Sequence, residues 1–139
     1  MQKLKSSGAV IYTEDRERKY LLLHYVEGHW DFVKGKVENS ESEIDALERE
    51  ANEETGIVDL QIIPEFREEL SYDFTSDGRT FHKDVVFFLA KTNQSIVRLS
   101  DEHIEYKWLN ANDAKNLLTY KSAKDILDKA EKSVNAETK

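Results

Sequence analysis

The stretch GKVENSESEIDALEREANEETGI, from Gly35 to Ile57, decides the fold of this chain. Ser40 and Ser42 are both suitable helix N-caps, and acidic residues follow them, where the positive end of the helix dipole favours negative charge. Gly56 is a typical stop signal. The stretch therefore predicts a helix of about four turns that begins after one of the two serines and ends at Gly56.

Two faces of this predicted helix differ in chemistry. The apolar face, at positions i, i+3 and i+7, carries Ile44, Leu47 and Ala51. A neighbouring acidic face, at i, i+3 and i+4, carries Glu50, Glu53 and Glu54. Like charges at this spacing repel by a few tenths of a kcal/mol per pair, and a charge run usually faces only water. The alternative is a bound cation, and carboxylate oxygen suits Mg²⁺, Mn²⁺ or Ca²⁺.

The whole stretch resembles the Nudix box, G-x(5)-E-x(7)-R-E-U-x-E-E-x-G-U, where U is a bulky apolar residue. The matching positions are Gly35, Glu41, Arg49, Glu50, Glu53, Glu54, Gly56 and Ile57. Ala51 departs from the pattern, since a larger aliphatic residue is usual there. Lys34-Gly35-Lys36 precedes the helix as a glycine-containing loop, as phosphate sites often have. The resemblance implies an enzyme that hydrolyses a nucleoside diphosphate linked to another group, on an α/β fold: an α/β/α sandwich with a mixed β-sheet.

Composition limits the other classes of function. The chain has 139 residues, 39% hydrophobic and 35% charged, with a net charge of −8, and we expect one domain over residues 1–139. Such a charge disfavours binding to extended nucleic acid or to an anionic membrane. There is no cysteine, no signal peptide is visible, and the apolar runs are too short to span a bilayer. These features favour a cytoplasmic protein.

Hydrophobic periodicity and turn signals predict the remaining elements. Strands are expected at Ser7–Thr13, Tyr20–Val26, Val58–Ile63 (ended by Pro64), Phe66–Phe74, Thr80–Lys91 and Glu105–Leu109. Asp77-Gly78 predicts a hairpin turn between the fourth and fifth of these. Helices are expected at Ala111–Leu118, capped by Asn110, and at Ala123–Lys132, capped by Ser122. The polar tail from about residue 133 is expected to be frayed.

Beyond the box, the chain resembles the asymmetrical diadenosine tetraphosphate hydrolases from Gly8 to about Ala130. The resemblance rests on GHW at 28–30, FREELSY at 66–72, KDVVFFLA at 83–90 and LSDEHIEYKWL at 99–109. It implies cleavage of diadenosine tetraphosphate to ATP and AMP by attack of water on phosphorus. The substrate partner would be a small nucleotide.

The resemblance also implies roles for individual residues. The metal, Mg²⁺ with Mn²⁺ as a possible substitute, would be held by Glu50, Glu53, Glu54, Glu102 and the main-chain carbonyl of Gly35. Either Glu54 or Glu102 would act as the base that helps water attack. Arg49 is expected to pair with a box glutamate and to orient it, and Glu41 is expected to act similarly from the helix start.

Other residues are candidates for binding the nucleotide. The resemblance nominates Tyr72 and Tyr120 as the two sides of an adenine clamp, and base–aromatic stacking contributes about 1–3 kcal/mol per base. His29 and Lys34 are candidate phosphate contacts. Lys83, with Arg79 or His82 as further candidates, would hold the distal phosphates.

Three other functions compete with this one. The first is a Nudix RNA 5′-pyrophosphohydrolase or a hydrolase of broad nucleoside diphosphate specificity. The second is a non-catalytic nucleotide sensor on the Nudix fold, although such proteins usually lose box glutamates and this chain keeps them. A purely structural acidic domain would leave the eight matches to chance.

Overall fold

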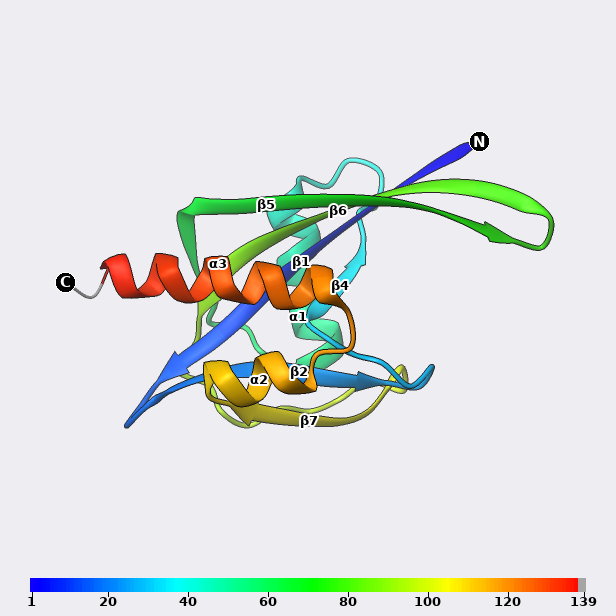
Figure 1. Ribbon diagram of the computed structural model, residues 1–139. Helices are drawn as coiled ribbons and strands as arrows, with labels where there is room; N and C mark the ends of the chain where they lie inside the picture. The colour runs from blue at the N-terminus through cyan, green and yellow to red at the C-terminus, as the bar shows by residue number, and fades with distance from the viewer. Residues whose placement is uncertain (138–139) are drawn as a thin grey trace.

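The computed structural model describes residues 1–137 (Figure 1). Its strands are β1 (Gln2–Glu14), β2 (Arg18–Tyr25), β3 (Trp30–Asp31), β4 (Val33–Lys36), β5 (Gln61–Ser76), β6 (Arg79–Lys91) and β7 (His103–Leu109). Its helices are α1 (Glu43–Thr55), α2 (Ala111–Leu117) and α3 (Lys121–Glu137).

The strands described form one mixed sheet. Its main order is β3-β2-β1-β6-β5, while β4 also pairs with β1 and β7 with β2. Strands β1 and β6 run parallel over Gln2–Tyr12 and Phe81–Lys91, and the other pairs are antiparallel. The long parallel pairing of β1 with β6 joins two distant parts of the chain at the centre of the sheet.

Helices cover both faces of this sheet, because the central strands are apolar on both sides. On one face, Val10, Leu22 and Phe87 pack with Ala114 of α2 and Leu127 of α3. On the other face, residues of the same strands pack against α1, as the pairing of Ile11 and Phe88 with Leu47 illustrates. The predicted α/β/α sandwich with a mixed sheet is confirmed (Figure 1).

Helix α1 begins and ends where its local signals predict. Ser42 is the N-cap, and it exchanges hydrogen bonds with Asp45 in a capping box; Gly56 ends the helix in the left-handed region, with φ 75°. Leu47 and Ala51 are buried as expected. Ile44 is 39% exposed, so its assignment to the apolar face was wrong: the core contact falls on Ala46 and Leu47 instead.

The residues before α1 form a strand, where the sequence predicted a loop. Lys34-Gly35-Lys36 belongs to β4 and pairs with Ser6–Gly8 of β1. Val33 is buried at the start of this strand. Pairing with β1 therefore holds the glycine in place, and this constraint comes from a distant part of the chain.

Strands β5 and β6 form the predicted hairpin, which projects well beyond the rest of the sheet (Figure 1). Asp77 and Gly78 have φ values of 51° and 74°, as a tight hairpin turn requires. The prediction that Pro64 ends a strand was wrong, because β5 continues through it. The register with β6 shifts between Ile63 and Arg67, and this irregularity accommodates a proline that cannot donate to the ladder.

At the C-terminal end, Asn110 caps α2 through Asp113, as predicted. Ser122 is not a cap, since α3 already begins at Lys121. This helix continues to Glu137 instead of ending near Lys132, because Val134 packs into the core. The last two residues of the predicted tail lie outside the described residues. None of the helices described has the length and apolar character needed to cross a bilayer.

Candidate active site

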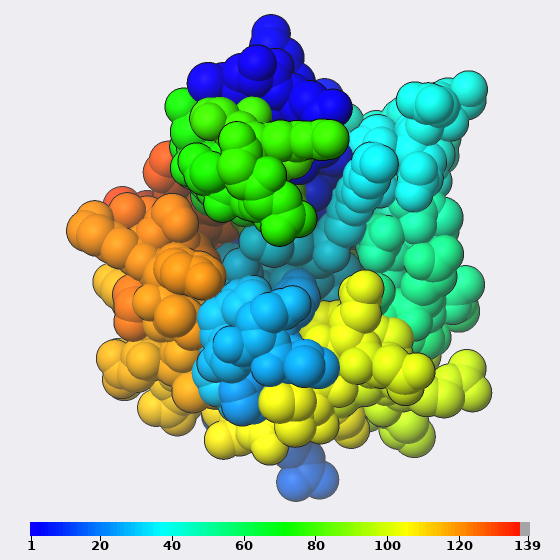
Figure 2. Space-filling model, turned by 90° about the vertical axis from the view of Figure 1, so that its right-hand side faces the viewer, coloured from blue at the N-terminus to red at the C-terminus, as the bar shows by residue number. Residues whose placement is uncertain are grey.

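A cavity of about 1000 Å³ opens on one side of the molecule. Its walls come from the base of the β5–β6 hairpin, the segment from Tyr25 to Gly35, the loop before β7 and the start of α3. Figure 2 faces this hollow, with the green hairpin above it, orange α3 on the left and the yellow loop before β7 at the lower right. Seven of the predicted site residues line it: His29, Lys34, Gly35, Tyr72, Lys83, Glu102 and Tyr120. The residues of α1 predicted for the site, which are Arg49, Glu50, Glu53 and Glu54, are not among its lining residues.

Gly35 lies at the edge of the cavity and packs directly against Glu50. A Cβ atom at position 35 would overlap the Cγ, Cδ and Oε2 atoms of Glu50. Only glycine therefore allows the buried Glu50 carboxylate to approach the backbone of β4 this closely. The predicted pairing of a glycine carbonyl with this carboxylate around one ion needs such an approach.

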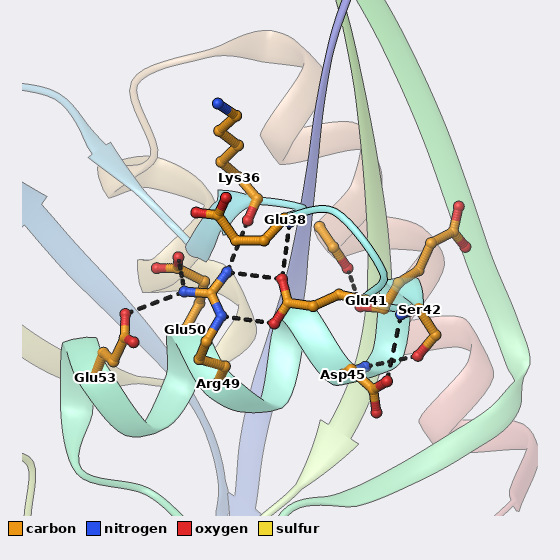
Figure 3. Close-up of polar contacts among 10 residues, drawn as sticks. Lys36, Glu38, Glu41, Ser42, Asp45, Arg49, Glu50 and Glu53 are labelled. Carbon is orange, nitrogen blue, oxygen red and sulfur yellow. Dashed lines mark hydrogen bonds and ion pairs between the residues drawn. The ribbon is translucent and has the colours of Figure 1, made fainter.

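Arg49 holds the box carboxylates together (Figure 3). Its guanidinium donates to Glu41 at 2.7 and 3.0 Å, to Glu50 at 2.8 Å and to Glu53 at 3.2 Å. It also donates to the main-chain carbonyl of Lys36 at 2.9 Å, which ties the helix to the end of β4. The predicted pairing of Arg49 with a box glutamate is present, and Glu41 acts on these glutamates through Arg49.

Glu54 is held from the opposite side, by the loop before β7. Its Oε2 accepts a hydrogen bond from the Ser100 hydroxyl at 2.8 Å and lies 2.8 Å from Nδ1 of His103. Burial lowers the pKa of His103, which favours a neutral imidazole that donates from Nδ1 to the carboxylate. Ser100, in the loop before β7, and His103, the first residue of β7, thus orient a single oxygen of Glu54.

The carboxylates of this site raise one another's proton affinity. Burial raises the pKa of Glu54 to about 7, and the nearby Glu102 and Glu50 contribute to the shift. Burial also raises the pKa of Glu50, although Arg49 opposes the change. Glu53 is more exposed than these two and forms an ion pair with Arg49. A divalent cation would relieve the repulsion among these groups.

The donor set fits such a cation. Clustered carboxylates beside a glycine carbonyl are the hard oxygen ligands that divalent ions prefer. As they stand, no three His, Asp or Glu side chains of residues 1–137 form a group that could hold a metal ion. Arg49 engages Glu50 and Glu53, so these two carboxylates would have to turn from the guanidinium toward the ion.

Aromatic side chains also line the cavity. Tyr72, on β5, is 42% exposed and Tyr120, before α3, is 49% exposed, so both rings have free surface for a base. The His29 ring stacks on Tyr25 with centroids 4.5 Å apart and lies 5.6 Å from the Tyr120 ring. His29 thus belongs to the wall next to one side of the predicted clamp.

Two lysines, Lys34 and Lys83, also line the cavity. Burial lowers the pKa of Lys83, and the charge of Lys34 contributes to the shift. Lys34 is paired with Asp31 at 3.1 Å. By contrast, His82 bridges Asp73 and Asp84 on the other face of the hairpin and is not among the residues that line the cavity, so its phosphate contact stays a prediction.

Sequence reasoning missed Tyr25, Ser100 and His103. Tyr25 is buried under His29 and donates to the Phe32 carbonyl at 2.6 Å, and its position deep in a strand concealed this role. Ser100 and His103 flank the predicted Glu102 in SDEH, and this proximity was a usable signal. No signal in the sequence indicated that this loop folds back onto α1.

Comparison with known proteins agrees with this geometry. The NUDIX domain family matches residues 3–130. The chain belongs to the Nudix family. It is a Nudix hydrolase, and enzymes of this family generally use divalent metal ions.

Individual relatives indicate which kinds of Nudix enzyme the chain is similar to. The chain is 37% identical to the mouse (Mus musculus) bis(5′-nucleosyl)-tetraphosphatase [asymmetrical], over 89% of this chain and 90% of the relative. A crystal structure of a C. elegans Ap4A hydrolase binary complex superposes with a TM-score of 0.85 at 32% identity, covering 96% of this chain and 98% of the other. A Helicobacter pylori RNA pyrophosphohydrolase is 34% identical over 53% of this chain and 46% of its own length.

Proposed function

We propose that this Nudix hydrolase cleaves dinucleoside polyphosphates, and that it converts diadenosine tetraphosphate to ATP and AMP with Mg²⁺ as its metal. The observation that carries the proposal is the lining of one cavity, which brings two exposed tyrosines, two lysines and Glu102 together with Gly35 of the box. Aromatic rings suit a nucleobase, and lysines suit a polyphosphate chain. The asymmetrical hydrolases named above support the choice of substrate.

Binding would begin at the clamp. The free faces of Tyr72 and Tyr120 would stack on one adenine, while Lys34 and Lys83 neutralise part of the phosphate charge. Lys83 is partly desolvated beside Lys34, and two such cations repel each other until an anion lies between them. The clamp and the lysines together would set which phosphorus reaches the carboxylates.

Glu50, Glu53, Glu54, Glu102 and the Gly35 carbonyl would hold the metal. When bound, a divalent ion neutralises phosphate charge and lowers the pKa of water. Arg49 keeps the carboxylates of α1 in register, and Gly35 leaves room for Glu50. Positioning and charge neutralisation of this kind dominate phosphoryl transfer.

Either Glu54 or Glu102 would accept the proton of the attacking water. Without metal, burial and the nearby Glu102 and Glu50 raise the pKa of Glu54, and a bound cation would lower it again, so the position of Glu54 and not this value supports its role as base. Ser100 and His103 hold its carboxylate in one orientation. Glu102 lines the cavity from the loop before β7 and is the alternative base.

The test is a panel of capped nucleotides assayed with Mg²⁺ for wild type and for Glu54→Gln. We expect turnover of diadenosine tetraphosphate and a loss of kcat by orders of magnitude in the variant, which keeps the side-chain shape but removes a charge. Glu48→Gln is the matched control, since Glu48 is an exposed glutamate of the same helix. A Glu54→Gln enzyme within threefold of wild type would contradict the assignment.

The same panel tests the RNA pyrophosphohydrolase alternative. The similarity to the Helicobacter pylori enzyme covers only about half of either chain. The net charge of −8 also disfavours an extended nucleic acid or an anionic membrane as partner, and we propose a small-molecule substrate in the cytoplasm. Rapid release of pyrophosphate from triphosphorylated RNA, with slow cleavage of diadenosine tetraphosphate, would favour the RNA enzyme.

A further inference from the structure

The β5–β6 hairpin carries a second aromatic group beyond the clamp. Phe74 and Phe81 are cross-strand partners whose rings stack at 5.1 Å between centroids, with 18° between their planes. The Phe74 ring also lies 6.0 Å from that of Tyr72, so the group is continuous with the cavity wall. Both phenylalanines are only partly buried, which leaves apolar ring surface in contact with water.

The two faces of the hairpin differ, because successive residues of a strand point to opposite sides. One face carries the cross-strand pairs Tyr72–Lys83, Phe74–Phe81 and Ser76–Arg79. Of the hairpin residues that line the cavity, Leu70, Tyr72 and Lys83 belong to this face and Ser71 to the other, so this face contributes most to the cavity wall. We call Phe74, Phe81 and Arg79, which continue this face outward, the hairpin roof.

On the opposite face of the hairpin, polar side chains contact one another. There Ser71 donates to Asp84 at 2.5 Å, and His82 bridges Asp84 and Asp73 at 2.9 and 2.7 Å. The outer face thus carries paired polar side chains, whereas the roof carries two stacked phenyl rings and an arginine.

We propose that the hairpin roof binds the second nucleoside of a dinucleoside polyphosphate, with its base stacked on the rings of Phe74 and Phe81. The proposal rests on the proposed function, since only a substrate with a base at each end needs two such sites. Stacked aromatic side chains next to cations are the general device for holding a base and its phosphates. The roof continues from Tyr72, which lines the cavity, and belongs to the hairpin that lies above the hollow in Figure 2.

The roof would give the enzyme a preference for two-headed substrates, which carry a nucleoside at each end of the phosphate chain. The clamp and the lysines act on any adenosine polyphosphate, because they contact one nucleoside and the phosphate chain. The roof adds stacking only when a second base is present. Diadenosine tetraphosphate should therefore bind more tightly than adenosine 5′-tetraphosphate, which has the same number of phosphates and one base fewer.

The experiment measures the affinities of these two ligands by isothermal titration calorimetry in EDTA, where no turnover occurs. The test variant is Phe74→Val combined with Phe81→Val, which keeps strand-forming side chains and removes both rings. The matched control is Thr75→Val combined with Thr80→Val, the neighbouring cross-strand pair on the opposite face. Sedimentation of each protein reports on its oligomeric state.

We expect the phenylalanine variant to lose affinity for diadenosine tetraphosphate by about fivefold or more, as the removal of one stacked base implies. Its affinity for adenosine 5′-tetraphosphate should stay within about twofold of wild type, which also shows that it is folded. The threonine variant should match wild type for both ligands.

Several results would overturn the proposal. They are equal losses for both ligands, no loss for either, or a wild type that binds both equally or binds neither. A wild-type dimer that the phenylalanine variant converts to a monomer, with unchanged ligand preference, would make the roof an interface between two copies. If the wild type prefers the two-headed ligand but does not hydrolyse it with Mg²⁺, the proposed function fails and the roof stands.

Discussion

Replacing Gly35 with alanine tests the geometry of the site most selectively. The backbone at Gly35 lies outside the left-handed region, so alanine is allowed there, and the contacts that its Cβ would make are with the side chain of Glu50. That side chain is flexible, but it is buried and held by Arg49. Relieving the overlap requires Glu50 to shift by about 1 Å, and a displacement of this size can cost about 10²-fold in rate.

The effect on stability should be much smaller. Only the contact between Arg49 and Glu50 is strained, so we expect the free energy of unfolding to fall by no more than about 2 kcal/mol. The assays are kcat and KM for diadenosine tetraphosphate with Mg²⁺, and urea unfolding followed by circular dichroism. Gly78→Ala is the control: its φ of 74° makes alanine cost about 1 kcal/mol, with no expected change in kcat. A Gly35→Ala enzyme with at least a third of wild-type kcat would refute the reasoning.

Four further predictions concern the remaining parts of the account. Removal of metal with EDTA should abolish turnover, and added Mg²⁺ should restore it; turnover that persists in EDTA would contradict a metal-dependent mechanism. Glu102→Gln should lower kcat with little change in KM, and a variant altered only in KM would identify a binding residue instead. Tyr72→Ala should raise KM about tenfold, since about 1–3 kcal/mol of stacking is lost, without moving the cleavage site, and steady-state kinetics with product analysis checks both. The Arg67 and Lys5 side chains lower the pKa of Glu43 to about 2, so its carboxylate stabilises the fold above pH 4.5 and this contribution disappears as the pH falls through 2. Since both cations are half exposed, Glu43→Gln should lower the free energy of unfolding by about 1 kcal/mol at pH 7 and by nothing near pH 2, and an equal loss at both would contradict the linkage.

Local signals predicted the elements that depend on local physics. The cap at Ser42, the stop at Gly56 and the turn at Asp77-Gly78 all involve residues a few positions apart, and each appears where the sequence places it. The hairpin and the cap at Asn110 are further examples. The strands, with helices before and after them, suggested a mixed sheet sandwiched by helices, and the resemblance to a known family implied the same α/β/α arrangement.

The errors come from interactions between distant segments. Strand β4 exists because β1 pairs with it, and no pattern in Lys34-Gly35-Lys36 indicates that partner. Helix α3 extends past Lys132 because the sheet offers a place for Val134. Ile44 has the spacing of a core residue, yet it is exposed, because Ala46 and Leu47 form the face of α1 that is buried against the sheet.

In the candidate site, too, local spacing predicted some features, while others depend on contacts between distant segments. The spacing of Glu50, Glu53 and Glu54 on one helix made their proximity predictable. The contact of His103 with Glu54 spans 49 positions and depends on how the loop before β7 folds back. The roles of these residues in metal binding and catalysis stay predictions.

The products of diadenosine tetraphosphate hydrolysis in ¹⁸O-labelled water test the central claim most directly. One clamp grips the substrate from one end, so the lysines and carboxylates should select a single phosphorus away from the middle of the chain. We predict ATP and AMP in equal amounts, with the label in AMP. Two molecules of ADP for each substrate would contradict the account.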